Sequence, residues 1–345
     1  MARSEQTFFI TGGAGFIGSA FVRLLLKENP SCDITNFDAL TYAGNMDNLE
    51  GLSSDNHHFV RADIADREAV LGALKERTDV VINFAAESHV DRSIASADEF
   101  LRTNIIGTNV LLDAARERGV RRFLQVSTDE VMGSLPDDES SFFTEKSPFA
   151  PNSPYAASKA AAEHLVRAAH HTFGFDTVIT RCGNNYGPRQ FPEKFLPLAI
   201  ANALSDQAIP VYGDGQNVRD WIYVEDHCRA IIRVVENGRS GETYNIGARN
   251  QRRNLDVVSS VLEVLGKPRS LIEFVKDRPG HDRRYAIDPS KTETELEWHP
   301  VETWESGLQK TIDWYLNNNQ WIERARSGAY RDYYKSQYGA EVVSI

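Results

Sequence analysis

The sequence has little sulfur, no long apolar run and a deficit of positive charge. It contains 3 cysteines in 345 residues, Cys32, Cys182 and Cys228, which are odd in number and far apart. We therefore expect buried reduced thiols, no disulfide framework and no metal site. No apolar run approaches the roughly 20 residues of a membrane span, and the first residues lack the basic, apolar and cleavage regions of a secretory signal. These absences predict a cytoplasmic protein without a membrane partner.

The charge balance excludes a further class of partner. The 38 Lys and Arg residues are outnumbered by 49 Asp and Glu residues, which gives a net charge of −11. A field of this sign repels phosphate, so we expect no nonspecific binding to nucleic acid. A phosphorylated ligand therefore requires a site that creates its own positive potential. With 41% hydrophobic and 25% charged residues, the composition is that of a globular protein.

The first part of the chain alternates short apolar runs with helical patterns. This rhythm predicts a Rossmann-type, doubly wound parallel sheet of the α/β class, because strands covered on both faces are apolar almost throughout. The expected strands are Thr7–Thr11, Asp33–Asp38, His58–Asp63, Val80–Ala85, Phe123–Ser127 and Thr177–Arg181. The expected helices are Phe16–Glu28, Asp66–Arg77, Ala97–Arg118 and Pro154–Phe173.

The rhythm ends at Cys182, where the chain becomes rich in Gly, Pro and Asn. We expect a smaller, discontinuous and mostly helical second domain built from residues 183–218 plus 251–345, and a first domain of residues 1–182 plus 219–250. Later expected elements are a helix at Phe195–Leu204, a strand at Asp220–Val224, a helix at Asp226–Glu236, a strand at Tyr244–Ile246 and an aromatic tail at residues 329–339.

A glycine-rich loop follows the first expected strand. In TGGAGFIGS, Gly12, Gly15 and Gly18 are spaced so that the backbone can turn tightly and approach a pyrophosphate at the start of a helix. Asp38 ends the second strand, where a carboxylate accepts hydrogen bonds from an adenosine ribose and repels a 2′-phosphate. The pattern predicts NAD rather than NADP; the alternative for Asp38 is a loop-capping role.

Two further clusters predict acid–base chemistry. Tyr155 and Lys159 are four residues apart on one helix face, and an ammonium near the phenol, with the charge of NAD⁺, is expected to lower its pKa. The fifth strand ends in Ser127-Thr128, followed by Asp129 and Glu130. Adjacent carboxyls push their pKa values apart, so one can act as acid and the other as base. The alternatives are a surface Tyr–Lys pair and an acidic loop edge.

Longer motifs identify a resemblance. They are TGGAGFIGS, NFAAESHVDRSI, STDEV, PNSPYAASKA, RCGNNYGPRQFPEK, GDGQNVRDWIYVEDHC and DRPGHDRRYAID. With them the chain resembles the extended short-chain dehydrogenase/reductase family and, within it, the dTDP-glucose 4,6-dehydratases, whose discriminating feature is the Asp-Glu pair after Ser-Thr. The resemblance implies a hydro-lyase of deoxysugar biosynthesis with a first domain that binds NAD, a second that binds the sugar nucleotide, and a homodimer formed through the helices expected at Ala97–Arg118 and Pro154–Phe173.

The resemblance also implies roles for the catalytic residues. Tyr155, supported by Lys159, takes the proton of the glucose 4-hydroxyl, and Thr128 hydrogen-bonds O4. Glu130 then takes the C5 proton and Asp129 protonates the departing 6-hydroxyl, while NAD is regenerated by hydride return to C6. The expected product is dTDP-4-keto-6-deoxyglucose.

The remaining site residues are expected partly from the strand ends and partly from the resemblance. Expected cofactor-binding residues are Gly12, Gly15, Phe16, Ile17, Gly18, Asp38, Leu40, Thr41, Asp63, Ile64, Ala85, Ala86, Thr103, Tyr155, Lys159 and Asn185. Expected substrate-binding residues are Ser88, His89, Thr128, Asn184, Lys194, Phe195, Pro210, Tyr212, Arg219, Asn254, Arg278 and His281. For His89 the alternative is a capping role. Arg283 and Arg284 we interpret as surface residues.

One position departs from the family pattern. Met132 stands where the family usually has Tyr, which predicts a more flexible pocket wall.

Other functions stay open. The alternatives are a 4,6-dehydratase or 4-epimerase acting on a UDP-, CDP- or GDP-hexose, or a noncatalytic NAD-sensing regulatory protein on the same fold. The epimerase has no evident use for Asp129 and Glu130, and the regulatory protein has none for Tyr155 and Lys159.

Overall fold

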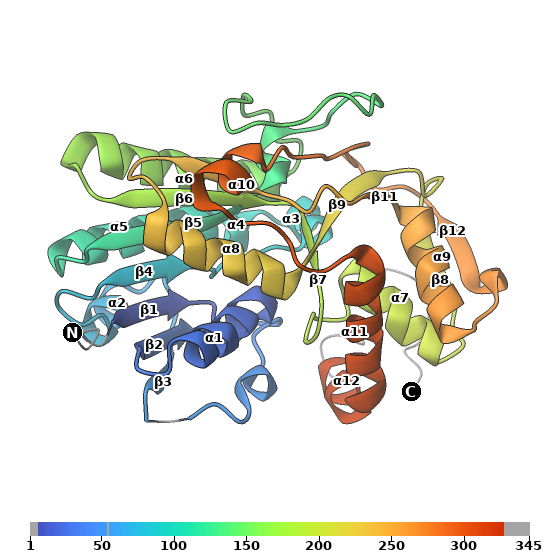
Figure 1. Cartoon of the computed structure of the whole chain (residues 1–345), viewed down its shortest axis with the longest axis horizontal. Helices are drawn as coiled ribbons and strands as arrows, with labels where there is room; N and C mark the ends of the chain where they lie inside the picture. The colour runs from blue at the N-terminus through green and yellow to red at the C-terminus, as the bar shows by residue number, and fades with distance from the viewer. Residues whose placement is uncertain (1–5, 54, 328–345) are drawn as a thin grey trace.

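The computed structural model describes residues 6–53 and 55–327, built around a seven-stranded parallel sheet. The strand order is β10-β6-β5-β4-β1-β2-β3, and Figure 1 shows the sheet in one half of the molecule. The strands are β1 (Thr7–Thr11), β2 (Asp33–Asp38), β3 (His57–Arg61), β4 (Val80–Asn83), β5 (Arg122–Thr128), β6 (Thr177–Cys182) and β10 (Thr243–Ile246). The predicted Rossmann-type architecture is confirmed.

Helices cover both faces of this sheet, which explains why its strands are apolar almost throughout. On one face α1 (Phe16–Glu28) and α8 (Val224–Asn237) pack in one core with β1, β4 and β6. On the other face lie α2 (Arg67–Ala73), α5 (Thr108–Glu117) and α6 (Pro154–Phe173). Because helices cover both faces of the sheet, a ligand can reach it only at the ends of the strands. In open parallel sheets ligands bind at the carboxyl ends.

The helix expected at Ala97–Arg118 is divided into three segments. It consists of α4 (Asp98–Phe100), a π-helical turn η2 (Leu101–Gly107) and α5. Within η2 the Asn104 side chain accepts from Glu87 N at 2.9 Å and donates to Glu87 O at 3.0 Å, so the wide turn is tied to the loop after β4. A helix that we did not predict, α3 (Val90–Ala95), lies in that loop.

The second part of the chain packs around its own core. It has a three-stranded sheet of β7 (Asn184–Tyr186), β9 (Val218–Tyr223) and β11 (Gln251–Arg253), and a parallel pair of β8 (Ile209–Tyr212) and β12 (Ile272–Val275). Around these lie α7 (Phe195–Leu204), α9 (Asn254–Leu265), α11 (Trp304–Asn317) and α12 (Asn319–Ala325). Figure 1 shows this group opposite the large sheet.

Two segments cross between the two parts. The strand expected at Asp220–Val224 belongs to the three-stranded sheet as β9, and α10 (Ser290–Leu296), which the sequence placed in the second domain, packs against β10 and α8. The proposed division at residues 182, 218 and 250 remains a prediction. The aromatic tail at residues 329–339 lies outside the described residues.

The described part of the chain confirms the expectation of buried thiols. Cys32, Cys182 and Cys228 are buried and form no disulfide. Between residues 6 and 327, leaving aside residue 54, no helix is long and apolar enough to cross a membrane.

Candidate active site

A cavity of about 480 Å³ lies at the carboxyl ends of the parallel strands and is closed from the opposite side by the second part of the chain. Its first wall comes from the residues after β1, β2, β3, β4, β5 and β6, and its second wall includes β8, the start of α9 and the loop around Arg278. Open parallel sheets bind their ligands at this edge. A volume in this range suits a cofactor or a substrate of moderate size.

The glycine loop forms one end of the cavity in a conformation that side chains would obstruct. Gly12 has φ +69°, and a Cβ there would lie 2.6 Å from Ala85 N. A Cβ on Gly18 would collide with Gly12 O. Gly15 is the N-cap of α1 and no side chain caps that helix, so its first N–H groups can bind an anion in the cavity that Gly15 and Phe16 line. This cradle fits the diphosphate of a dinucleotide.

Asp38 occupies the position that selects the ribose. Its Oδ2 accepts from Ala14 N at 2.9 Å and its Oδ1 from Leu40 N at 2.8 Å, while the side chain also lines the cavity. Burial raises the pKa of Asp38, and the two backbone N–H groups oppose that rise. The Asp38 carboxylate can therefore hold the loop and bind a ligand at the same time, so the two interpretations do not exclude each other. Leu40 itself does not line the cavity; it contributes through its N–H.

The structure gathers nearly all the expected binding residues on this one cavity. The expected residues that line it are Gly12, Gly15, Phe16, Ile17, Gly18, Asp38, Thr41, Asp63, Ile64, Ala85, Ala86, Ser88, His89, Thr103, Thr128, Tyr155, Lys159, Asn184, Asn185, Lys194, Phe195, Pro210, Tyr212, Arg219, Asn254, Arg278 and His281. Besides Leu40, the exceptions are Asp129 and Glu130, which lie directly behind Thr128. Asp63 also forms an ion pair with Arg102 at 2.9 Å.

The two adjacent carboxyls differ in environment. They begin the short 3₁₀ turn η3 (Asp129–Met132), which Thr128 caps by accepting from Glu130 N at 3.3 Å. Asp129 is buried, and among the described residues its Oδ2 has no hydrogen-bond partner. Burial, followed by the charge of Glu130, raises the pKa of Asp129 well above its usual range. Asp129 therefore favours the protonated form.

Three cations act on Glu130. Burial raises the pKa of Glu130, but Arg278, Arg219 and Lys194 oppose the rise. Glu130 is thus the member of the pair that more readily stays ionised, and the same three side chains line the cavity. They give an acidic protein the local positive potential that a diphosphate requires.

Tyr155 and Lys159 lie in the first turns of α6, which Ser153 caps and Pro154 begins. Lys159 Nζ donates to Val126 O at 2.7 Å, and burial lowers the lysine pKa to about 8. Burial, followed by the charge of Glu130, raises the pKa of Tyr155 well above its usual range. In the chain without cofactor, desolvation and nearby acidic groups dominate, and the lowering expected from Lys159 together with the charge of NAD⁺ stays a prediction.

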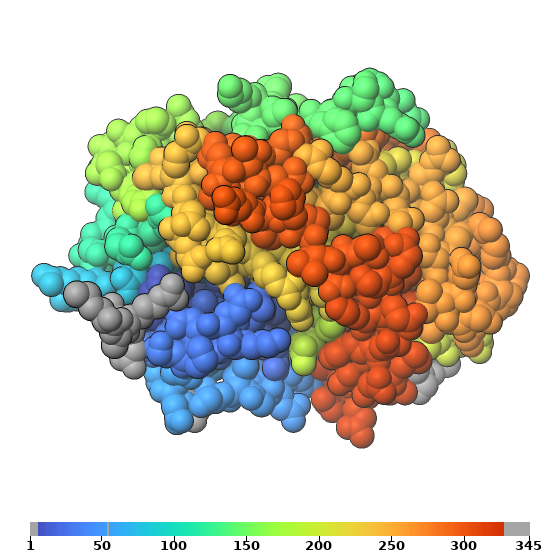
Figure 2. Space-filling view, in the orientation of Figure 1, coloured from blue at the N-terminus to red at the C-terminus, as the bar shows by residue number. Residues whose placement is uncertain are grey.

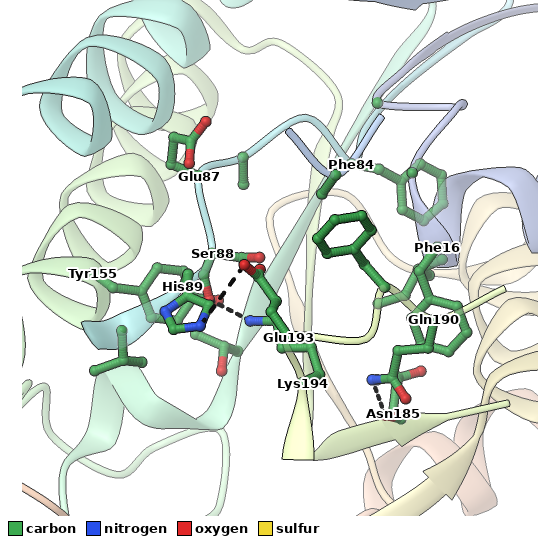
Figure 3. A pocket seen from close by; sticks show the side chains of 18 of the residues that line it. Phe16, Phe84, Glu87, Ser88, His89, Tyr155, Asn185, Gln190, Glu193 and Lys194 are labelled. Atoms are coloured by element: carbon green, nitrogen blue, oxygen red, sulfur yellow. Dashed lines mark hydrogen bonds and ion pairs between the residues drawn. The ribbon is translucent and has the colours of Figure 1, made fainter. Parts of the chain in front are cut away.

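His89 combines the two roles that the sequence left as alternatives. It caps α3, with Nδ1 accepting from Arg92 N at 3.4 Å, and it lines the cavity. Burial, followed by the charges of Lys194 and Arg92, lowers the His89 pKa to about 2, so the ring is neutral. Figure 3 shows His89 pointing to Glu193, with Nε2 and Oε2 3.8 Å apart, and Lys194 reaching Ser88 O at 2.7 Å.

Sequence reasoning missed several polar residues of the wall. Glu193 is buried beside Arg92 at 3.5 Å, and burial raises its pKa to about 7. Asp91 accepts from Tyr212 OH at 3.1 Å and from Arg278 Nη1 at 3.3 Å, which joins α3 to the second part of the chain. Both lie inside motifs that we quoted, but only the fold reveals that they line the cavity.

The interpretations of Arg284 and Met132 are wrong. Arg284 is not a surface residue: it is buried and donates to Ser141 O at 2.8 Å and Gln251 Oε1 at 2.6 Å. Arg283 is half-exposed at the surface, as interpreted, and pairs with Asp214 at 2.9 Å. Met132 does not line the cavity, because η3 turns it into a small buried core, where its sulfur lies 3.5 Å from Arg181 Nη1.

A buried histidine supports the cavity wall and gives a pH prediction. His227 Nδ1 lies 2.8 Å from Asn185 Oδ1, and burial lowers its pKa to about 3. An unfolded His227 takes up a proton below its ordinary pKa while the folded one does not, so its contribution to stability is present near pH 7 and falls with decreasing pH. Relative to His227→Asn, which keeps an N–H donor, we expect the wild type to lose roughly 3 kcal/mol more between pH 7 and 4. Urea unfolding of both proteins measures this difference; an equal pH dependence would contradict the neutral buried ring.

Comparison with known proteins places the chain among nucleotide-sugar enzymes. The family model described as GDP-mannose 4,6 dehydratase matches residues 9–311. A dTDP-glucose 4,6-dehydratase of Xanthomonas campestris pv. campestris is 51% identical over 94% of this chain and 97% of its own. The crystal structure of DesIV, a dTDP-glucose 4,6-dehydratase from Streptomyces venezuelae with NAD bound, has a TM-score of 0.90 and 46% identity over 93% of this chain and 100% of that one. A UDP-glucose 4-epimerase from Thermotoga maritima is 28% identical, with a TM-score of 0.84 over 90% of this chain and 99% of that one.

In the described part of the chain no group of three or more His, Cys, Asp or Glu side chains is arranged to hold a metal ion. The polar side chains that line the cavity include carboxyls, a phenol, ammonium and guanidinium groups, amides and imidazoles.

Proposed function

The chain belongs to the GDP-mannose 4,6-dehydratase family, and from this membership we propose that it is an NAD-dependent dTDP-glucose 4,6-dehydratase, a hydro-lyase that forms dTDP-4-keto-6-deoxyglucose. The family name covers a group of enzymes, whereas the relatives at 46–51% identity reported above are named dTDP-glucose 4,6-dehydratases. The observation that carries the proposal is the pair of buried Asp129 and partly buried Glu130 beside Tyr155, because the environments of the two carboxyls separate an acid from a base.

The glycine cradle, the uncapped start of α1 and Asp38 are the groups that fit NAD. When bound, NAD supplies reversible hydride chemistry, so that it is not consumed overall. Asp38 accepts from the adenosine ribose, while the residues after β3 and β4 flank the adenine and the rest of the cofactor. Lys194, Arg219 and Arg278 hold the diphosphate of the substrate through charge-assisted hydrogen bonds.

The side chains divide the proton transfers between them. Tyr155 takes the proton of the 4-hydroxyl, and Thr128 hydrogen-bonds O4. Oxidation at C4 acidifies the C5–H, so Glu130 can remove that proton. Asp129, kept protonated by burial, donates to the 6-hydroxyl as it leaves as water. Each such step contributes about 10²–10⁴-fold in rate. To the Lys159 ammonium, which donates to Val126 O, we assign the stabilisation of the tyrosinate.

The alternatives are less well supported by the site. A 4-epimerase on the same fold needs the tyrosine and lysine but no acid–base pair behind the threonine, and the epimerase neighbour is far less similar in sequence. A noncatalytic regulatory protein has no use for Tyr155 and Lys159, and both face the cavity.

A comparison of different nucleotide sugars as substrates tests the proposed function. Purified protein with a catalytic amount of NAD is incubated with dTDP-glucose and with UDP-, CDP- and GDP-hexoses, and the products are identified by NMR. We expect a 4-keto-6-deoxy sugar from dTDP-glucose at the highest rate. A higher rate with another nucleotide sugar would show that this sugar is the preferred substrate. Formation of a 4-epimer would show that the protein is an epimerase and not a dehydratase.

Asp38 gives a prediction about cofactor choice. Asp38→Asn removes the negative charge that disfavours a 2′-phosphate but keeps one oxygen acceptor. We expect NAD to bind about tenfold more weakly and the preference for NAD over NADP to fall by at least that factor, since a charged hydrogen bond contributes about 1.5–3 kcal/mol. Titration calorimetry with both cofactors measures the ratio; an unchanged ratio would remove Asp38 from cofactor selection.

Three further features belong to the same proposal. The protein works in the cytoplasm, where nucleotide sugars and NAD are available. It forms a homodimer through the helical surface that includes α5 and α6; Leu101 and Ile106 of the adjoining η2 expose apolar side chains there. Residues 1–182 plus 219–250 bind NAD, and residues 183–218 plus 251–345 bind the sugar nucleotide.

A further inference from the structure

The C-terminal helix α12 contacts the N-terminal part of the chain close to the glycine loop. Trp321 Nε1 donates to Asn48 Oδ1 at 3.0 Å, although the two residues are 273 positions apart. Trp321 and Asn48 are 5% and 1% exposed, so the bond is shielded from water. At its rim, Arg324 Nε lies 2.6 Å from Asp47 Oδ2. Figure 2 shows the red C-terminal and the blue N-terminal segments along a common lower edge.

Asn48 continues this contact to the backbone of the glycine loop. Its Nδ2 donates to Ala14 O at 2.9 Å, so the two ends of one amide join Trp321 to Ala14. Ala14 O also accepts from Asn45 N at 3.1 Å, and Ala14 N donates to Asp38 Oδ2 at 2.9 Å. The peptide groups on both sides of Ala14 are therefore fixed, and the neighbouring residue, Gly15, starts the helix that faces the diphosphate.

Helix α11, which precedes α12, also holds the other wall of the cavity. Tyr315 OH donates to Gln190 O at 2.6 Å, and Gln190 Nε2 donates to Asn185 O at 2.9 Å. Gln190 and Asn185 both line the cavity. The ring of Trp321 packs against Tyr315 and Trp314, with centroids 6.2 and 5.1 Å apart. α11 and α12 thus connect two walls that belong to different parts of the chain.

We propose that Trp321 is a positioning residue for the cofactor: through Asn48 it fixes Ala14 and so holds the glycine loop in the conformation that binds NAD. The inference rests on the proposed function only in that NAD occupies the loop. These contacts already restrict the glycine loop before NAD binds, so the loop loses less conformational entropy on binding. The N–H groups of the loop can turn away from the diphosphate only if the Trp321–Asn48–Ala14 contacts break. Slow release suits a reaction that regenerates its cofactor in every turnover.

The rate of NAD release tests this role. Trp321→Phe keeps an aromatic ring and removes the N–H donor. We expect radiolabelled NAD to dissociate about tenfold faster from this variant, equivalent to about 1.4 kcal/mol. The matched control is Trp314→Phe, which changes a neighbouring ring of the same cluster and should leave release unchanged. Wild-type release from Trp321→Phe, or equally fast release from both variants, would overturn the proposal.

A double-mutant cycle distinguishes positioning from general packing. If Trp321 acts through Asn48, then Trp321→Phe has little further effect on NAD release in an Asn48→Ala background. Additive effects of the two substitutions would contradict the route through Asn48. A purely structural role would lower the melting temperature of the cofactor-free protein without changing release. Failure to dehydrate dTDP-glucose would refute the proposed function by its products and leave the release measurements interpretable.

Discussion

Glu130→Gln should oxidise the sugar at C4 and then stop. Glutamine keeps the size of the side chain but cannot accept the C5 proton, so we expect product formation to fall by about 10²–10⁴-fold. Oxidation should persist, because Tyr155 and Lys159 are unchanged, and it should be visible as the ultraviolet absorbance of reduced cofactor. Exchange of the C5 hydrogen with deuterated water should be lost to the same extent as product formation.

The control for this variant is Glu139→Gln, which neutralises an exposed glutamate in the loop that follows η3. It should exchange C5 and form product at the wild-type rate. Rapid C5 exchange in Glu130→Gln would show that another group is the base. Loss of C4 oxidation in Glu130→Gln would show instead that the carboxylate acts in the first step or holds the site together.

Asp129→Asn should act one step later than Glu130→Gln, at the loss of water. Burial holds Asp129 in the protonated form that a general acid requires, and asparagine cannot donate that proton. We expect water loss to slow by about 10²–10⁴-fold, while C4 oxidation and C5 exchange continue. Rapid-quench analysis of the sugar during a single turnover measures all three.

Asp137→Asn is the matched control for the acid, since Asp137 is an exposed aspartate in the same loop. Equal rates of water loss in Asp129→Asn and wild type would remove Asp129 from the acid role. If C5 exchange stopped in Asp129→Asn as it does in Glu130→Gln, the two carboxyls would act as one unit, and the separate assignments would fail.

The fold was predictable where local patterns and buried strands coincide. β1, β2, α1, α6 and α7 begin and end at the residues expected from apolar runs and helix starts. Short elements were missed, because three or four residues of β7, β8, β11 or β12 carry no periodic signal and depend on tertiary pairing. The π-helical turn η2 was also missed, since the side chain of Asn104, and not a local propensity, ties it to the loop after β4.

The site was predictable where motifs follow strands, and unpredictable where distant segments meet. Gly12, Asp38 and Thr128 follow strand ends, so the sheet topology alone brings them together. Asp91 and Glu193 acquire their places only through contacts with Arg278, His89 and Arg92. Met132 illustrates the converse: its neighbours in sequence are catalytic candidates, but the 3₁₀ turn rotates it into a buried core.

Transfer of an isotope from C4 to C6 tests most directly whether the enzyme removes water by an internal redox cycle. dTDP-glucose labelled with deuterium at C4 is converted with a catalytic amount of unlabelled NAD, and the product is examined by NMR and mass spectrometry. We expect a 4-keto-6-deoxy sugar that carries the deuterium at C6, with no net formation of NADH. A product with its 6-hydroxyl intact, or one whose C6 lacks the label, would rule out the internal redox cycle.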